Sequence, residues 1–240
     1  MTDPATLAEV PPAVRARLAI ALDVDDAVVA LRLAKEVRPW FGVAKVGLEL
    51  YCAVGPDIVT SLQDLGYDVF ADLKLHDIPT TVERAARVMG ALGPRYLNFH
   101  TQGGADMLRA GVEGLKEGAA GAGLPEPTAL GVTVLTSDPA TSEGELARRA
   151  TLARDAGCTG VVCAATDLGV IQGVDPALVT VVPGIRTTGS SADDQVRVAT
   201  PAEAITAGAS VLVVGRTVTR SDEPARAAAA VAAEAARALT

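Results

Sequence analysis

The chain has 240 residues, of which 49% are hydrophobic, and a formal net charge of −8 at pH 7. A chain of this length can bury one large core, and its negative charge argues against nucleic acid or an anionic membrane surface as a partner. No apolar run approaches the roughly 20 residues of a membrane span, and the first residues lack the basic start of a signal peptide. Cys52, Cys158 and Cys163 have no metal or redox spacing, so we expect a cytoplasmic protein.

Short apolar runs alternate along the chain with longer segments of helical spacing. In chain order, strands are predicted at residues 18–23, 42–47, 69–75, 96–100, 128–135, 160–164, 180–183 and 211–214. Helices are predicted at about 26–37, 49–65, 80–92, from the fourth strand to about 117, 143–156, 168–172, and after Ser221, which is a suitable N-cap. A helical segment is also expected before the first strand.

This alternation predicts a (β/α)8 barrel, because near-continuous apolar strands separated by helices form a parallel sheet that is covered on both faces. A doubly wound open sheet is the alternative architecture. It is disfavoured because no Gly-x-Gly-x-x-Gly turn follows the first strand. No linker divides the sequence, so we expect residues 1–240 to form a single catalytic domain.

The most informative stretch carries three charged residues at the end of the third predicted strand. Asp72 and Lys74 are two residues apart and therefore project to the same side of a strand. Asp77 follows the strand end, where a loop can bring it back over the same face. Burying charge is costly unless the charges are paired, so a stability argument alone would favour leucine at these positions. A structural salt bridge at a strand end is the alternative interpretation.

Polar residues are also predicted at the carboxyl ends of the other strands, where barrels of this kind place their function. In chain order they are Asp23, Lys45, Asp72, Lys74, Asp77, His100, Thr101, Thr136, Ser137, Arg186 and Arg216. Charged residues inside apolar strands are exceptional, so their alignment at one rim indicates a functional site. Structural roles are expected for His76 and His100, and no cluster has the spacing of metal ligands.

Two arginines predict a phosphate site. Arg186 and Arg216 follow the last two predicted strands, which is the usual phosphate position in such barrels. The planar guanidinium fork suits phosphate, although either arginine alone would be interpreted as a surface residue. Gln195 lies in a nearby polar segment that is predicted to close over the phosphate. An ordinary surface loop is the alternative for that segment.

Together these residues resemble the orotidine 5'-phosphate decarboxylase family. Residues 72–77 match its Asp-x-Lys-x-x-Asp pattern, and the resemblance runs from about residue 18 to 221. The continuation Ile78-Pro79-x-Thr81 and the pair of Arg186 with Gln195 are more specific to this family than the charge pattern is. Further matches, in the family's order, are Ala21-Leu22-Asp23, Lys45-Val46-Gly47, Leu135-Thr136-Ser137, Pro183-Gly184-Ile185-Arg186, Asp194-Gln195 and Val214-Gly215-Arg216.

The resemblance implies decarboxylation at C6 of a pyrimidine nucleotide, giving UMP and CO2 in pyrimidine biosynthesis, with no metal or organic cofactor. It places Lys74 against C6, where an ammonium would stabilise the carbanion and then donate a proton. Asp72 would lie beside the departing carboxylate, either stressing it or holding Lys74 charged and oriented. Lys45 would complete an alternating Lys-Asp-Lys-Asp chain that titrates as a unit.

The resemblance also implies a homodimer with shared sites, in which Asp77 and Thr81 reach the neighbouring subunit's site. Asp23 and Thr81 would contact the ribose hydroxyls, and Thr136 would bind the pyrimidine. The residues that would hold the phosphate are Arg186, Gln195, Gly215 and Arg216.

Two other functions stay open from the sequence. One is a Mg²⁺-dependent sugar-phosphate decarboxylase or synthase of the same barrel superfamily, which would act on an enediolate. Ile78-Pro79-x-Thr81 and Gln195 argue against this class. The other is a non-catalytic phosphate-binding barrel, which is disfavoured because only catalysis would offset the cost of burying the charged chain.

Overall fold

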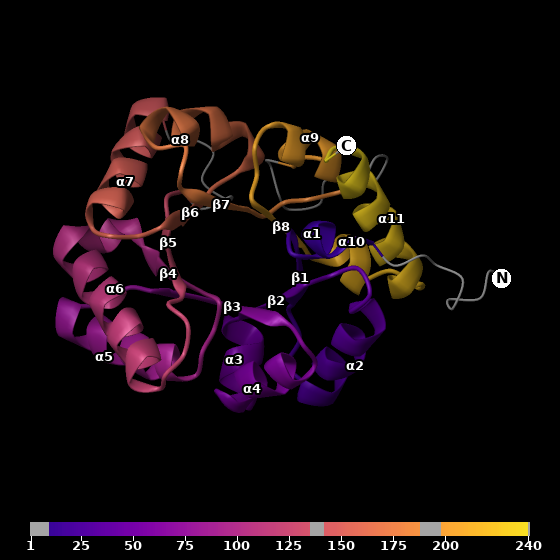
Figure 1. Ribbon diagram of the computed structural model, residues 1–240, viewed down its shortest axis with the longest axis horizontal. Coiled ribbons are helices and arrows are strands. Elements are labelled where there is room, and N and C mark those ends of the chain that lie inside the picture. Colours follow the sequence, from indigo (N-terminus) through magenta and orange to yellow (C-terminus); the bar gives the residue numbers. More distant parts are fainter. Residues whose placement is uncertain (1–9, 135–141, 188–197, 240) are drawn as a thin grey trace.

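The computed structural model describes residues 10–134, 142–187 and 198–239. Parallel strands pair in sequence order and close into a barrel that is surrounded by helices (Figure 1). The strands are β1 (Leu18–Leu22), β2 (Val43–Gly47), β3 (Asp68–Leu75), β4 (Tyr96–His100), β5 (Thr128–Val132), β6 (Gly160–Val162), β7 (Val179–Val182) and β8 (Val211–Val214). Direct pairing of β1 with β8 confirms the predicted (β/α)8 barrel and excludes the open sheet.

The helices follow the strands in alternation, as predicted. They are α1 (Pro12–Arg15), α2 (Ala27–Val37), α3 (Leu48–Val54), α4 (Asp57–Asp64), α5 (Pro79–Ala91), α6 (Gly104–Gly121), α7 (Glu143–Asp155), α8 (Leu168–Val174), α9 (Pro201–Thr206), α10 (Arg216–Thr219) and α11 (Pro224–Arg237), with short 3-10 turns η2 (Thr101–Gly103) and η3 (Ala165–Asp167). None of the described helices is long and apolar enough to cross a bilayer.

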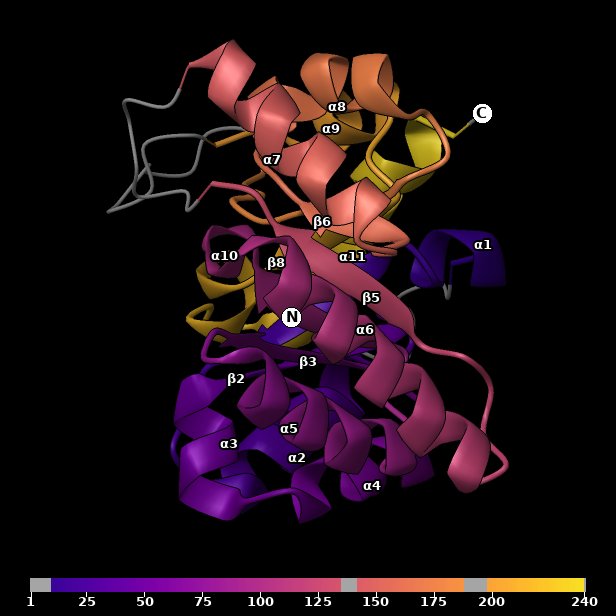
Figure 2. The same ribbon diagram turned by 90° about the vertical axis from the view of Figure 1, so that its left-hand side faces the viewer.

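The expected N-terminal helical segment is α1. It lies at the end of the barrel opposite α10, which follows β8 (Figure 2). The backbone N–H of Gly42 donates to the Arg15 carbonyl over 2.8 Å, which ties α1 to the start of β2. The amino-terminal end of the barrel is therefore occupied by α1.

Side-chain alternation along the strands divides the core into two parts. In β1, Leu18, Ile20 and Leu22 pack in the layer shared with the helices. The alanines between them, Ala19 and Ala21, face the barrel interior, where small side chains fit the limited space. Both sets are buried, which explains why the strands are apolar throughout rather than alternating with polar residues.

Several predicted boundaries differ from the structure. Ser221 is not the N-cap of the last helix, because α11 begins at Pro224 after Glu223, and proline favours the first helical position. The predicted segment 49–65 is divided into two helices at Gly55, whose φ is +83°. β5 ends at Val132, before the predicted limit. Helices α9 and α10 were not predicted.

Candidate active site

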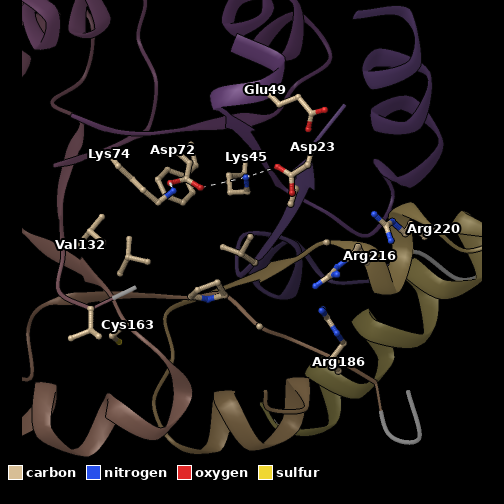
Figure 3. A pocket seen from close by; sticks show the side chains of 18 residues that line it. Asp23, Lys45, Glu49, Asp72, Lys74, Val132, Cys163, Arg186, Arg216 and Arg220 are labelled. Carbon is tan, nitrogen blue, oxygen red and sulfur yellow. Dashed lines mark hydrogen bonds and ion pairs between the residues drawn. The ribbon is translucent and has the colours of Figure 1, made fainter. Parts of the chain in front are cut away.

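A pocket of about 470 Å³ lies at the carboxyl ends of the strands (Figure 3). Its apolar lining includes Phe70, Val132, Val162 and Cys163 from the barrel strands and the residues that follow them. The charged lining residues are Asp23, Lys45, Glu49, Asp72, Lys74, Arg186, Arg216 and Arg220. Glu49 and Arg220 are the two that sequence reasoning did not single out.

Four charged side chains from neighbouring strands form an alternating row, which we call the charged row: Asp23, Lys45, Asp72 and Lys74. Lys45 Nζ lies 2.9 Å from Asp23 Oδ1 and 3.4 Å from Asp72 Oδ2. Lys74 Nζ lies 2.5 Å from Asp72 Oδ1. Figure 3 shows the row extending across one side of the pocket. Each inner member therefore lies between two opposite charges.

Neighbouring charges keep the two inner members ionised, against the effect of burial. Burial would raise the pKa of the Asp72 carboxyl, but Lys45 and Lys74, with hydrogen bonds from Lys74 and Asn98, hold this pKa below its ordinary value. Burial would lower the pKa of Lys45, but Asp72 and Asp23 raise it above its ordinary value. The Lys45 side chain is 9% exposed and that of Lys74 is 34% exposed, so Lys74 is the ammonium group more open to the pocket.

Glycines leave the space that the site requires. A Cβ added to Gly47 would lie 3.1 Å from both Asp23 Oδ1 and Lys45 Nζ, so the bare backbone at the end of β2 lets this ion pair form. Gly184 has a φ of +82°, which side-chain-bearing residues rarely adopt. This turn leads the chain from β7 towards Arg186.

Three arginines gather at the other side of the pocket. Arg186 is 7% exposed, and its guanidinium donates to the Ile185 carbonyl over 3.1 Å. Arg216 is the first residue of α10, directly after Gly215, and Arg220 follows one helical turn later. Figure 3 shows the Arg186 and Arg216 side chains directed towards the same part of the pocket. Guanidinium groups in this arrangement suit a phosphate dianion.

The remaining predicted site residues lie elsewhere. Asp77 and Thr81 are exposed and are not among the described residues that line the pocket. Asp77 Oδ1 accepts the backbone N–H of Ile78 over 2.6 Å, at the start of α5. Thr136 and Gln195 lie outside the described residues. Within the described ranges, no group of three His, Cys, Asp or Glu residues is arranged to hold a metal ion.

Both histidines of the chain lie beside the charged row. The rings of His76 and His100 are stacked, with centroids 5.4 Å apart and planes 19° from parallel. Burial, then the nearby charges of His76, Arg149 and Lys74, lower the pKa of the His100 imidazole. A packing role for His100, as expected from the sequence, is in keeping with this neutral, buried ring.

Sequence reasoning did not identify Asn98, a fully buried residue in β4. Its Nδ2 donates to Asp72 Oδ1 over 2.7 Å, and its Oδ1 accepts the backbone N–H of Lys74 over 2.7 Å. The available signal was an asparagine between two apolar residues in a predicted strand, because a buried carboxamide must find hydrogen-bond partners.

Fold and site together define a (β/α)8 barrel with a charged pocket at the carboxyl ends of its strands. The sequence profile described as "Orotidine 5'-phosphate decarboxylase / HUMPS family" matches residues 16–231. The chain belongs to this family.

Relatives and solved structures cover nearly the same span. A protein named Orotidine 5'-phosphate decarboxylase from Moorella thermoacetica is 43% identical over 230 residues, which is 91% of each chain. One of the same name from Nitratidesulfovibrio vulgaris is 46% identical over 91% of this chain and 97% of its own. The crystal structure of orotidine 5'-phosphate decarboxylase from Lactobacillus acidophilus has a TM-score of 0.77 and 31% identity, covering 91% of this chain and 98% of that chain.

Proposed function

We propose that this chain is a carboxy-lyase that converts orotidine 5'-phosphate to UMP and CO2, the last step of new UMP synthesis. The observation that carries the proposal is the charged row, whose inner members Lys45 and Asp72 are largely buried and which faces three arginines across one pocket. The names of its relatives support the same reaction. We also propose that residues 1–240 form one catalytic domain and that the protein is cytoplasmic, in keeping with three free cysteines.

Lys74 is the proposed proton donor. When the bond between C6 and the carboxylate breaks, the electron pair stays on C6, where no adjacent carbonyl can take up the charge. An ammonium group fixed beside C6 stabilises this charge without reorganisation and then transfers its proton to form the C6–H bond. Lys74 suits this role because it is the more exposed lysine of the row and its position is set by Asp72.

Asp72 and Lys45 are proposed to keep Lys74 charged and oriented. Asp72 uses one oxygen for Lys74 and the other for Lys45, so its carboxylate cannot turn without breaking an ion pair. Electrostatic stress between Asp72 and the substrate carboxylate is the second proposed contribution of Asp72. Because the row is coupled, it titrates as one system.

The arginine side of the pocket is proposed to bind the 5'-phosphate through Arg186, Arg216 and Arg220, with Gly215 and Gln195. Each charge-assisted hydrogen bond contributes about 1.5–3 kcal/mol before ordering costs. Binding energy from this remote group can be used to desolvate and orient the pyrimidine at Lys74. Asp23 is proposed to bind the ribose, and Thr136 the pyrimidine.

We propose a homodimer with shared sites, in which Asp77 and Thr81 reach the site of the neighbouring subunit. Both are exposed and are not part of the pocket lining of their own chain, and Ile78 and Leu48, which are 66% and 54% exposed, provide apolar surface for a second copy. Mixing inactive D77A with inactive K74A should restore activity, because each heterodimer would contain one site with both wild-type residues. Heterodimers that form without regaining activity would contradict the shared site.

Absorbance of the pyrimidine tests the reaction directly, because loss of the C6 carboxylate changes the chromophore. EDTA-treated protein should convert orotidine 5'-phosphate completely. Phosphorylated sugars with Mg²⁺ are the matched test of the metal-dependent alternative. That alternative is not favoured, since the carboxylates of the charged row are already paired with ammonium groups, whereas Mg²⁺ is bound by carboxylates through their oxygens. Turnover of the sugar phosphates alone would overturn the proposed function.

A further inference from the structure

Asn98 stands opposite an irregularity in the neighbouring strand. β3 and β4 are in register at Ala71 and again at Leu75. Between these positions β3 has three residues, whereas β4 has only Asn98. These three residues are Asp72, Leu73 and Lys74. β3 therefore bulges where it carries two of the four members of the charged row. Bulges beside active sites commonly redirect a side chain.

The bulge gives Lys74 an unusual backbone conformation. Its φ is +49°, and it is the one non-glycine residue with positive φ among those the structure describes. This left-handed region is unfavourable for lysine and persists only where surrounding contacts hold it. In this conformation the Lys74 ammonium forms an ion pair with Asp72 Oδ1. Something next to Lys74 must therefore stabilise this backbone.

The Asn98 carboxamide supplies both contacts that the bulge requires. Its oxygen accepts the Lys74 backbone N–H over 2.7 Å, and its NH2 group donates to Asp72 Oδ1 over 2.7 Å. A carboxamide offers a strong donor and a strong acceptor at once at any pH, whereas an ionised carboxylate of the same size only accepts. The residue is fully buried and does not line the pocket, so it acts through Asp72 and Lys74 rather than on a substrate.

We propose that Asn98 is a positioning residue that holds Lys74 in its left-handed conformation and Asp72 in the orientation that the charged row requires. The proposal rests on the proposed function, because it assigns the effect of Asn98 to proton delivery by Lys74. It adds a residue from β4 to the four of the charged row, which lie on or directly after β1, β2 and β3.

The N98D variant separates this role from simple packing. It keeps the size of the side chain and the acceptor for the Lys74 N–H, but it places a carboxylate oxygen against Asp72. Two carboxylates at such a distance share a proton, which raises one pKa strongly. We expect kcat to fall about 100-fold near pH 8, the loss typical of a misplaced catalytic group. We expect kcat to recover as the pH falls towards about 6, since a protonated carboxyl again donates to Asp72.

The charged groups around the introduced carboxyl are Asp72 and Lys74 on β3, and Lys45 beyond Asp72. The next charged or titratable groups are His100 on the same strand as Asn98, His76 stacked on His100, and Arg149 close to His100. Wild type contains the same histidines and lysines. A pH dependence seen only in N98D therefore belongs to the introduced carboxyl. KM should change by less than about threefold, because the arginines proposed to bind the phosphate follow β7 and β8 and do not contact Asn98.

Two further variants complete the test. T133V is the matched control: Thr133 is buried directly after β5 and donates to the Val162 carbonyl over 2.9 Å, without touching the charged row, so kcat should be unchanged. N98L removes both contacts at similar volume, and should lower kcat at every pH. If N98L does not fold, the pH profile of N98D alone tests the positioning role of Asn98.

A measurement independent of turnover keeps this inference distinct from the proposed function. The pKa of the Asp72 carboxyl, followed by carbon NMR, should rise in N98L because a donor to the charged form is lost. An unchanged Asp72 pKa, or N98D with kcat within about threefold of wild type near pH 8, would overturn the role of Asn98. Absence of turnover in wild type would instead overturn the proposed function.

Discussion

The two sides of the pocket differ in how their charges are balanced. The charged row combines two carboxylates with two ammonium groups, which neutralise one another and fix one another's positions. The arginine side brings three guanidinium groups together, an arrangement that favours an incoming dianion. The row is thus organised before substrate arrives, whereas the arginines provide attraction for substrate. Changes in the row should affect kcat and stability, and changes among the arginines should affect mainly KM.

The largest effect is expected from D72A. It leaves Lys45 and Lys74 without their shared partner, and breaking a buried ion pair in this way costs about 3–5 kcal/mol. We expect kcat to fall by at least about 1,000-fold, since the preorganised cation loses its orientation. Denaturant unfolding and steady-state kinetics measure the two effects. E83Q is the control, because Glu83 pairs with Arg87 on the exposed face of α5 and its loss should cost less than about 0.5 kcal/mol.

A smaller effect is expected from G47A. The new methyl group would lie 3.1 Å from both atoms of the Asp23–Lys45 pair, so these side chains must shift. We expect kcat/KM to fall about 10-fold, which corresponds to about 1.4 kcal/mol. G144A is the matched control, because no atom lies within 4 Å of the added Cβ. Equal kinetics for G47A and wild type would show that the pair does not need this space.

The arginine side should respond differently. R220Q removes an exposed guanidinium at the pocket mouth, so we expect KM to rise about fivefold with kcat unchanged, and the difference to shrink in high salt. R226Q serves as the control, because Arg226 on α11 pairs with Glu223, the N-cap of that helix, and does not line the pocket. A fall in kcat with unchanged KM would place Arg220 in the chemical step and contradict this division.

The pH dependence of stability gives the mildest test. Asp72 has a lowered pKa when folded, so its contribution is present above its unfolded value of about 3.9 and is lost as the pH falls through the folded value. Lys45 has a raised pKa, so its contribution is present below about 10.4 and is lost as the pH rises through the folded value. The stability difference between wild type and D72A should therefore be level near neutral pH and decrease towards both extremes. A maximum at acid pH would contradict these assignments.

The fold and the proximity of Asp72 to Lys74 were predicted from local patterns. The resemblance implied an alternating chain of Lys45, Asp72, Lys74 and Asp77, whereas the row within this chain ends at Asp23. Alternating apolar strands and helices predict the barrel, and the two-residue spacing of Asp72 and Lys74 predicts their shared side. Boundaries were less secure: Ser221 had the chemistry of an N-cap, but Pro224 sets the start of α11. The signal for α9 was present, since Thr200 and Glu203 form a capping box around Pro201.

The role of Asn98 could not be predicted from the sequence. Its role depends on how β3 and β4 align, and that register is set by long-range pairing rather than by neighbours in the chain. The left-handed backbone of Lys74 is likewise a consequence of this pairing. The place of Glu49 and Arg220 at the pocket depends on the path of the connections that follow β2 and β8, which no local pattern encodes.

The central claim is that Lys74 performs the chemistry in a site whose nucleotide binding lies elsewhere. The most direct test follows orotidine 5'-phosphate by absorbance with K74A and wild type, both EDTA-treated, while calorimetry measures UMP binding to the same samples. We predict rapid conversion by wild type, no detectable conversion by K74A, and UMP affinities within about tenfold of one another, or about 1.4 kcal/mol. Comparable turnover by both proteins would contradict the account, as would K74A losing activity only because it no longer binds nucleotide.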